Sequence, residues 1–282
     1  MAMIAFASNS LLCRAALKQT SIDAATFIFV RIVSGAVVLW LIVMVRRSKS
    51  KVEGNWISAF ALFVYAAAFS FAYVDLAAGT GALLLFGAVQ ATMILWGFHK
   101  GECLRAIQIA GLIVALIGLV VLLLPGLSAP PLTGAILMLS AGVAWGIYSL
   151  RGKNVEDAIG ATTGNFLRAF AFAAGLSLIL FRHAHVDLNG IGYAVISGAI
   201  TSGIGYVIWY NAMPGLKAAS AATVQLSVPV IAATGGILFL SESITLRYLI
   251  ASIAVIGGIA LVVLEKNDPE SADSNSRLDV GR

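Results

Sequence analysis

The fold is decided by residues 216–242, LKAASAATVQLSVPVIAATGGILFLSE, an apolar run that ends on Glu242. Residues 76–102, which lie 140 positions earlier, read LAAGTGALLLFGAVQATMILWGFHKGE and end on Glu102. In this register the small residues near the start of one stretch fall on small residues of the other, as Ala218 does on Ala78. Self-similarity at a fixed offset indicates that the chain contains one half twice.

The composition is that of a membrane protein. Of 282 residues, 60% are apolar and 11% are charged, with a mean hydropathy of +0.96, whereas about a quarter of a soluble domain is charged. Only helices and closed barrels satisfy their backbone groups inside lipid. The apolar runs are continuous and about 20 residues long, the length a spanning helix needs, and do not alternate as barrel strands do. We therefore predict an all-α, polytopic membrane protein.

Charged residues, prolines and glycines divide the chain into ten predicted spans. They are residues 2–17, 24–45, 55–74, 77–98, 104–124, 132–150, 160–181, 190–212, 217–240 and 246–264. The repeat extends over both halves, because at an offset of 137 residues Arg14 falls on Arg151 and Arg31 on Arg168. Five spans per half force the second copy to enter from the opposite side, which is the inverted repeat of secondary transporters. We expect one repeat at 1–125, a second at 132–264 and a disordered cytoplasmic tail at 265–282.

Basic residues indicate how the chain is oriented. If the N-terminus lies inside, nine basic residues fall in inner loops and four at the outer side. The inner ones are Arg46, Arg47, Lys49, Lys51, Lys100, Arg105, Arg151, Lys153 and Lys217, and the outer ones are Arg14, Lys18, Arg182 and Arg247. Positive charge concentrates on the cytoplasmic side, so both termini are predicted to be cytoplasmic. The net charge of +5 is thus a signal of topology and does not suggest nucleic acid as a partner.

Four charged residues are predicted to have structural roles. Arg31 and Arg168 each lie inside a span, where a charge is costly, and we expect each to reach the interface or bind helix-end carbonyls of its own half. An anion or carboxylate site is the alternative for this pair. Glu102 and Glu242 precede the next helix, where a carboxylate satisfies free N–H groups, and Glu242 also lies near Arg247 in the sequence. Proton coupling is the alternative for the glutamates, although no acidic residue is expected near the membrane midplane.

Aromatic and amide side chains are the candidates for solute binding. Tyrosine hydroxyls and glutamine amides near the middle of a span are costly to bury in lipid, so they are expected to face a cavity. The predicted binding residues are Asn9, Tyr65, Tyr73, Gln90, Trp145, Tyr148, Tyr206, Tyr210 and Gln225. The cavity would be aromatic, mildly polar and uncharged, which suits a flat or amphiphilic solute. Pro229 frees the carbonyl of Gln225 from its helical bond and is the predicted hinge.

Small residues mark the predicted scaffold. In the fifth and tenth spans they recur at helical spacing, which permits close backbone approach. These residues are Gly111, Ala115, Gly118, Ala251, Ala254 and Gly258. Gly198, Ser202 and Gly205 suggest tight packing of the eighth span as well.

The joint order of these features resembles the drug/metabolite transporter superfamily, specifically its EamA-type exporters. The chain is most similar to the branch that exports aromatic amino acids and paraquat. The resemblance implies a central cavity lined by spans 1, 3, 4, 6, 8 and 9, with spans 5 and 10 as scaffold. Two family features are kept only in the second half. The Trp-Gly pair of the family is Trp145-Gly146 in the second half, whereas Ser8-Asn9 stands at the matching position of the first half. The proline of the family is Pro229 in the second half, whereas Val89 stands at the matching position of the first half.

We therefore expect a secondary transporter of the bacterial inner membrane that exports small organic solutes, most of all aromatic or hydrophobic amino acids, by alternating access. Other amino acids, metabolites and cationic drugs such as paraquat are alternative solutes. An intramembrane enzyme is disfavoured, because His99, His183 and His185 fall in turns and no nucleophile or zinc motif occurs. A purely structural membrane protein is a further alternative. No cofactor or metal is expected, and the protein is expected to lie in the lipid bilayer. Facilitated diffusion and proton coupling are both left open as the energy source, and so is the oligomeric state.

Overall fold

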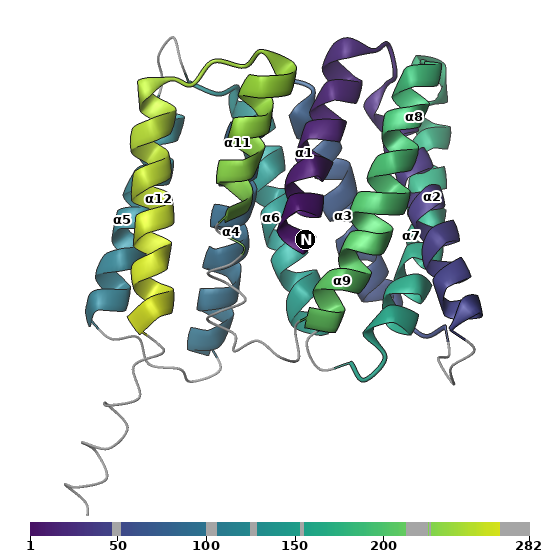
Figure 1. Ribbon diagram of the computed structural model, residues 1–282, viewed down its shortest axis with the longest axis horizontal. Coiled ribbons are helices and arrows are strands. Elements are labelled where there is room, and N and C mark those ends of the chain that lie inside the picture. The colour runs from purple at the N-terminus through teal and green to yellow at the C-terminus, as the bar shows by residue number, and fades with distance from the viewer. Residues whose placement is uncertain are drawn as a thin grey trace, which may run out of the picture.

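The computed structural model describes residues 1–46, 52–99, 106–124, 129–152, 155–212, 225 and 227–265. Within these ranges the chain forms helices joined by turns and contains no strand (Figure 1). The elements are α1 (Ala2–Gln19), α2 (Ala24–Val45), α3 (Trp56–Tyr73), α4 (Ala78–His99), α5 (Ala106–Leu123), α6 (Leu132–Gly152), α7 (Ala158–Ile179), η1 (Phe181–His183), α8 (Leu188–Ile196), η2 (Ser197–Ile204), α9 (Gly205–Ala212), α11 (Ser227–Leu240) and α12 (Leu246–Glu265).

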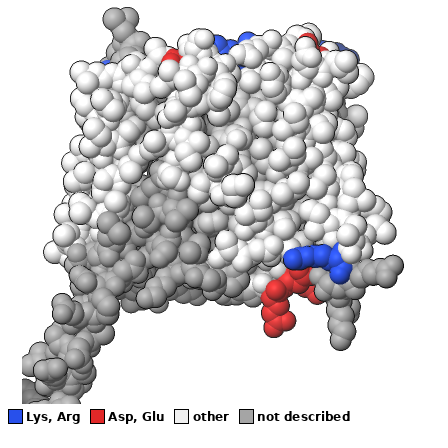
Figure 2. All heavy atoms as spheres, viewed as in Figure 1, with Lys and Arg blue, Asp and Glu red and all other residues white. Residues whose placement is uncertain are grey.

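The helices of the described residues agree with the predicted spans, and the ninth span is described only at residue 225 and from Ser227 to Leu240. Because α8, η2 and α9 follow one another without a break, they form one long rod from Leu188 to Ala212. This rod and five other helices of the described chain are long and apolar enough to cross a membrane, and α11 and the apolar part of α12 are shorter. Lysine, arginine, aspartate and glutamate lie at the two ends of the visible face, and a wide uncharged band separates them (Figure 2). The protein is therefore an all-α, multi-pass membrane protein.

Four helices begin on a capping side chain that the sequence supplies at the end of a turn. Asp23, Asn55, Asp157 and Asp187 each accept a hydrogen bond from a backbone N–H in the first turn of the following helix. Such caps satisfy N–H groups that have no partner inside the helix. They explain why the predicted and observed starts agree within two residues for these helices.

The two ends of the bundle are named here after a residue of each. The Glu242 end, at the top of Figure 1, contains the turns at residues 20–23, 74–77 and 241–245, and the Arg151 end contains those at 52–55 and 155–157. Arg14, late in α1, contacts the Glu242 end, whereas Arg151, late in α6, contacts the other. Helices α1 and α6 therefore run in opposite directions, as an inverted repeat requires. The division into repeats at 1–125 and 132–264 stays a prediction.

Helices α5 and α12 pack together at one side of the molecule (Figure 1). A Cβ atom at Gly118 would lie 2.8 Å from that of Ala254, and one at Gly258 would overlap the carbonyl oxygen of Gly111. The predicted close approach of these two helices is confirmed.

The π-helix η2 lies against α2. A Cβ atom at Gly198 would overlap the carbonyl oxygen of Arg31, which confirms the tight packing predicted for this span. π-helical turns are rare and are frequent at functional sites. Here the widened turns hold Ser197, Thr201 and Ser202 buried in the bundle.

Some predictions lie outside the described residues. These include the tail beyond Glu265, Glu102, and all of the stretch 216–224 that begins the second copy.

Candidate functional site

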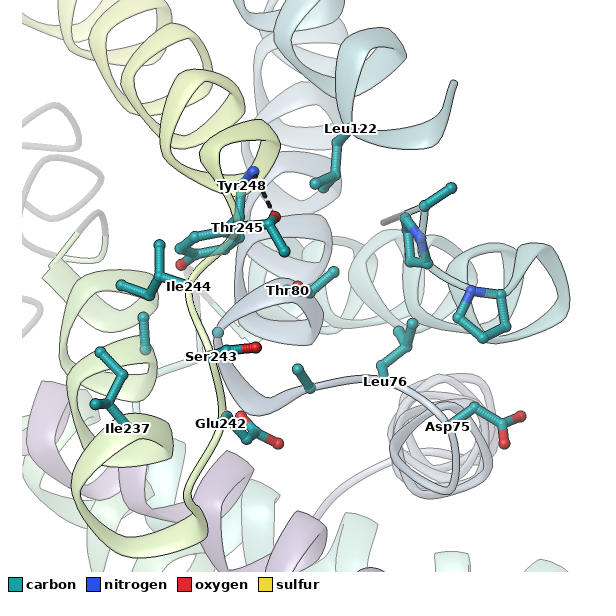
Figure 3. Close-up of a pocket in the computed structure, with 16 residues that line it drawn as sticks. Asp75, Leu76, Thr80, Leu122, Ile237, Glu242, Ser243, Ile244, Thr245 and Tyr248 are labelled. Carbon is teal, nitrogen blue, oxygen red and sulfur yellow. Dashed lines mark hydrogen bonds between the residues drawn. The ribbon is translucent and has the colours of Figure 1, made fainter. Parts of the chain in front are cut away.

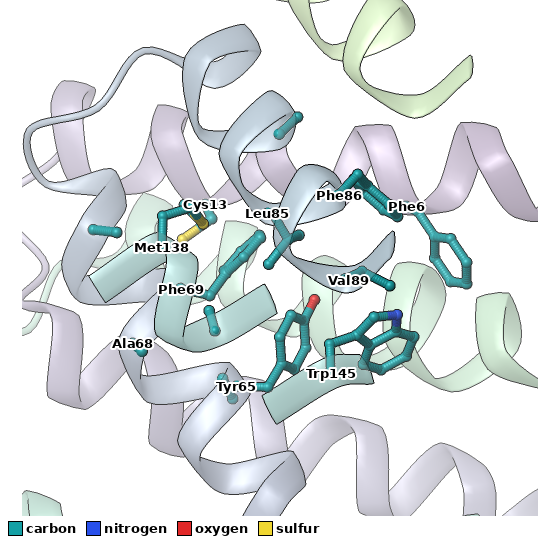
Figure 4. Close-up of a cluster of buried hydrophobic side chains, with 14 of the residues drawn as sticks. Phe6, Cys13, Tyr65, Ala68, Phe69, Leu85, Phe86, Val89, Met138 and Trp145 are labelled. Carbon is teal, nitrogen blue, oxygen red and sulfur yellow. The ribbon is translucent and has the colours of Figure 1, made fainter. Parts of the chain in front are cut away.

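Aromatic rings from both halves of the chain meet in the centre of the bundle. Trp145 of α6 lies among them, with ring centroids 4.9 Å from Tyr65 of α3, 5.0 Å from Tyr206 of α9, 5.7 Å from Tyr148 and 6.0 Å from Phe6 of α1. Figure 4 shows Tyr65 and Trp145 side by side, with Phe69 and Leu85 farther along the same cluster. Aromatic side chains from α1, α3, α6 and α9 therefore form one cluster in the centre of the bundle.

A buried polar group adjoins these rings. The side-chain amide nitrogen of Asn9 donates to the hydroxyl of Tyr65 at 3.3 Å, and its oxygen accepts from Ser197 at 2.7 Å. The hydroxyl of Thr201 lies 3.2 Å from the same oxygen. Asn9 belongs to the first half and the two hydroxyls to η2 in the second, so these bonds join the halves.

Arg31 contradicts the prediction made for it. The side chain does not reach the interface or a helix-end carbonyl, because it is only 2% exposed. Its Nε donates to Ser202 Oγ and its Nη2 to the hydroxyl of Tyr65, both at 3.3 Å. The guanidinium carbon lies 5.0 Å from the ring centroid of Phe69 and 5.3 Å from that of Tyr65. The charge of Arg31 is therefore buried beside the central aromatic cluster, although Arg31 is not among the residues that line the central cavity.

The central cavity is closed in this conformation. Its volume is about 10 Å³, and its lining residues are Phe6, Asn9, Tyr65, Phe69, Leu85, Phe86, Trp145, Thr201 and Tyr206. They come from spans 1, 3, 4, 6 and 8, which are five of the six spans that the family resemblance implies for the cavity. A cavity of this size cannot hold an organic solute.

A larger pocket of about 450 Å³ opens at the Arg151 end. Tyr148 and Tyr210 line it, together with Arg151, Asn165 and Ser58. Tyr148 also contacts Trp145, with ring centroids 5.7 Å apart. The pocket thus ends against the same aromatic cluster that surrounds the central cavity.

Arginines of the second half hold the turn before α3 at this end. Arg151 donates to Ser58 Oγ at 2.9 Å and Asn55 Oδ1 at 3.2 Å. Arg168 donates to the carbonyl oxygens of Glu53 at 2.8 Å and Gly164 at 2.9 Å. Arg168 therefore binds carbonyls, but that of Gly164 lies inside α7 and that of Glu53 belongs to the other half, so neither is the helix-end carbonyl of its own half that was predicted. Since the matching residue Arg31 is buried, the two arginines are not equivalent.

The Glu242 end is held by one ion pair and several carbonyls. Arg14 Nε lies 3.2 Å from Glu242 Oε1, and Arg14 Nη1 donates to the carbonyl oxygens of Tyr73 and Val74 at 3.0 and 2.7 Å. Glu242 Oε2 accepts from the N–H of Ala78 at 2.8 Å. Glu242 is thus a helix-end group as predicted, but it serves the start of α4.

The expected neighbour of Glu242 in the sequence is engaged elsewhere. Arg247 donates to the carbonyl oxygen of Leu124. A pocket of about 230 Å³ at this end has Glu242 and Asp75 on different sides (Figure 3).

The nine predicted binding residues separate into groups. Asn9, Tyr65, Trp145 and Tyr206 line the central cavity, and Tyr148 and Tyr210 line the pocket at the Arg151 end. Tyr73 lies away from both, since its hydroxyl donates to the carbonyl oxygen of Ala78 at 3.2 Å. Gln90 and Gln225 are buried but line neither space.

The hinge prediction is not tested. Pro229 is buried near the beginning of α11, and Gln225 four residues earlier is also helical. The intervening Leu226 lies outside the described residues.

Sequence reasoning missed several residues of the centre. Phe6, Phe86 and Thr201 line the cavity, but no periodicity separates them from ordinary packing residues. The signal that was available is Arg31, an unexplained charge eight residues into an apolar helix.

The described residues form ten helical segments of a membrane protein, and the comparison of sequences gives the class of this protein as a transporter. The sequence pattern of the EamA-like transporter family matches residues 132–264, and the chain belongs to this family, within the drug/metabolite transporter superfamily.

Three relatives illustrate its neighbourhood. An uncharacterised protein of Pseudomonas aeruginosa is 54% identical over 93% of this chain and 92% of its own length. The threonine/homoserine exporter RhtA of Escherichia coli K12 is 30% identical over 61% of this chain and 60% of its own. A probable terminal-alkyne amino-acid exporter of Streptantibioticus cattleyicolor is 28% identical over 67% and 65%.

A solved crystal structure shares the fold. It aligns with a TM-score of 0.67 at 19% identity, over 94% of this chain and 96% of its own.

Proposed function

We propose that the protein exports small organic solutes, most of all aromatic or hydrophobic amino acids, across a bacterial inner membrane by alternating access. The observation that carries this proposal is the closed aromatic centre, built from both halves, between a large pocket at one end and an ion pair at the other. The names of two relatives, a threonine/homoserine exporter and a probable terminal-alkyne amino-acid exporter, support it.

The path begins at the Arg151 end, which the count of basic residues assigns to the cytoplasm. A solute enters the pocket beside Tyr148 and Tyr210 and meets the ring of Trp145. The centre then opens around it while the Arg151 end closes. Loss of the contacts between Arg14 and Glu242 finally opens the far side. Rings provide a broad apolar surface that tolerates related side chains.

The test is counterflow in proteoliposomes that contain the purified protein, against a panel of amino acids and organic cations with and without a pH gradient. We expect saturable flux of aromatic or hydrophobic amino acids. Absence of flux for every amino acid of the panel would contradict the proposal. A requirement for the pH gradient would distinguish proton coupling from facilitated diffusion.

Trp145 provides the matching variant. Trp145→Ala removes the ring that joins the pocket to the centre, and should lower flux at least about tenfold, as expected when a buried aromatic anchor is lost. Trp40→Ala is the control, because Trp40 lies on α2 and is 44% exposed on the outer surface of the bundle. Wild-type flux by Trp145→Ala would remove Trp145 from the path.

A further inference from the structure

Arg31 is a buried cation without a counter-ion. In the described parts of the chain the one ion pair joins Arg14 and Glu242, and the hydrogen-bond partners of Arg31 are the neutral hydroxyls of Ser202 and Tyr65. The remaining nitrogen, Nη1, is buried without any partner. An unpaired charge inside a membrane protein costs several kcal/mol, so such a residue calls for a functional explanation.

Hydrogen-bond donors exceed acceptors around this charge. The hydroxyl oxygen of Tyr65 accepts from Arg31 and from Asn9, and the oxygen of Asn9 accepts from Ser197. The hydroxyl of Tyr206, which lines the central cavity together with Tyr65, is buried and has no partner among the described residues. Two donors, Arg31 Nη1 and the hydroxyl of Tyr206, are thus left for an acceptor that the described residues do not provide. A planar guanidinium with a free nitrogen fits a carboxylate.

The surroundings of the charge are apolar. The rings of Phe69 and Tyr65 lie against the guanidinium, and Trp145 and Phe6 continue the wall. No acidic side chain lines the cavity among the described residues. An ammonium group would therefore find no anionic partner there and would be repelled by Arg31.

We propose that Arg31 binds the carboxylate of the transported solute, and that the recognised class is small organic acids with an apolar body, to which hydrophobic amino acids belong. This inference rests on the proposed function and deepens it. The amino group is not the feature recognised at Arg31. Cationic drugs such as paraquat are excluded by the same charge. The carboxylate reaches Arg31 when the wall formed by Tyr65 and Trp145 separates from α1 and α9, because the closed cavity is too small.

The experiment compares competitors that differ in one group. Counterflow of radiolabelled L-phenylalanine, and separately of L-threonine, is measured in proteoliposomes. The competitors for the first are 3-phenylpropionate, which lacks the amine, and phenylalaninamide, which lacks the carboxylate. Those for the second are 3-hydroxybutyrate and threoninamide. We expect the acids to compete at concentrations within a few-fold of the parent, and the amides to need on the order of 10- to 100-fold more, the range of one hydrogen bond to a charged group.

Variants connect this preference to Arg31. Arg31→Gln should remove the preference of acid over amide, and Arg31→Lys should keep it with weaker binding, since the charge stays but the planar fork is lost. Arg168→Gln is the control, because it removes the matching arginine of the second half, which contacts carbonyls outside the cavity, and it should keep the preference. If Arg31→Gln does not fold, the role of Arg31 is decided by the competition measured with the wild type and by the binding measured with Arg31→Lys.

The outcomes separate the two proposals. Equal competition by acid and amide in the wild type, or an unchanged preference in Arg31→Gln, would overturn the role of Arg31 and leave transport standing. Absence of flux for these two and for every other amino acid of the panel would overturn the proposed function itself.

Discussion

Glu242 joins three separate segments of the chain through one side chain. It pairs with Arg14 of α1 and accepts from the first N–H of α4, while its own backbone lies between α11 and α12. Both members of the pair are partly buried, with side chains 12% and 10% exposed. The pair is therefore less screened by water than a surface pair would be.

Glu242→Gln should loosen this end of the bundle. Loss of such a pair costs on the order of 1 kcal/mol, about a fivefold change in an opening equilibrium. Cys13, fully buried one residue before Arg14, reports the opening. In a Cys103→Ser background, labelling of Cys13 by a maleimide should become about fivefold faster. Arg247→Gln is the control, because Arg247 does not contact Glu242. Equal labelling rates in the two variants would contradict this role.

At the level of secondary-structure elements, Asp23 and Asp187 connect the turn before α2 with the turn before α8. Asp23 caps α2 and also accepts from the backbone N–H of His185 at 2.9 Å, while Asp187 caps α8 and accepts from Ser21 at 3.4 Å. Burial by itself raises the pKa of Asp23, but the hydrogen bonds from Thr26, His185 and Ala25 outweigh it and hold this pKa below its usual value. The carboxylate form is thus favoured by the folded state.

The sign of the pH dependence follows from this lowered pKa. The stabilisation by Asp23 is complete above its unfolded pKa of about 3.9, and it is lost as the pH falls through the lower folded value. Asp23→Ala should lower the free energy of unfolding by about 1 kcal/mol at pH 7, as loss of a helix cap does. The difference in Tm from the wild type should shrink below about pH 4. A difference that is independent of pH would contradict the assignment. Thermal unfolding in detergent provides the measurement.

Two adjacent glycines of α12, Gly257 and Gly258, allow the close packing of α12 against α5 to be tested. A Cβ atom at Gly258 would overlap the backbone of α5, whereas one at Gly257 would meet nothing within 4 Å. Gly258→Ala should therefore destabilise the protein by about 1–3 kcal/mol, the usual cost of overpacking. Gly257→Ala should be neutral or slightly stabilising, because alanine favours the helix. The Tm of both variants in detergent decides, and equal values would show that the helices do not pack this closely.

At the scale of the whole molecule, the assignment of sides rests on basic residues. We expect a membrane-impermeant maleimide to label Ser21→Cys in intact cells, because this exposed residue lies in a turn of the Glu242 end. Glu156→Cys, exposed at the Arg151 end, should be labelled only after permeabilisation. Both variants are made in a background with Cys13→Ala and Cys103→Ser. The reverse pattern would place the Arg151 pocket outside and change export into uptake.

Two arginines that match in the predicted repeat have different contacts in the bundle. Arg14 and Arg151 fall on each other in the repeat, yet one holds an ion pair at the Glu242 end and the other lines an open pocket at the opposite end. A strictly symmetric structure would give both the same contacts. The difference is what a transporter open at one end requires.

Composition and apolar patterning are enough to predict the class of protein, the described helices and four of the nine residues that line the central cavity. Long apolar runs and their breakers are local properties, since a helix satisfies its backbone within one segment. This explains why the bounds of α2 agree with the predicted span and why Tyr65, Trp145 and Tyr206 were found as polar aromatics in apolar surroundings.

The face that each helix presents to a neighbouring helix is decided by packing in the folded protein. The rotation of a helix about its axis depends on packing between segments far apart in the chain, such as α2 against η2 and Arg14 against Glu242. The sequence therefore assigned Tyr73 to the cavity, although its hydroxyl bonds the start of α4. The sequence also predicts that Arg31 reaches the membrane interface, because the long side chain of an arginine can extend to the interface or stay inside the bundle. Its contacts with Ser202, Tyr65 and Phe69 show that the charge is buried at the centre.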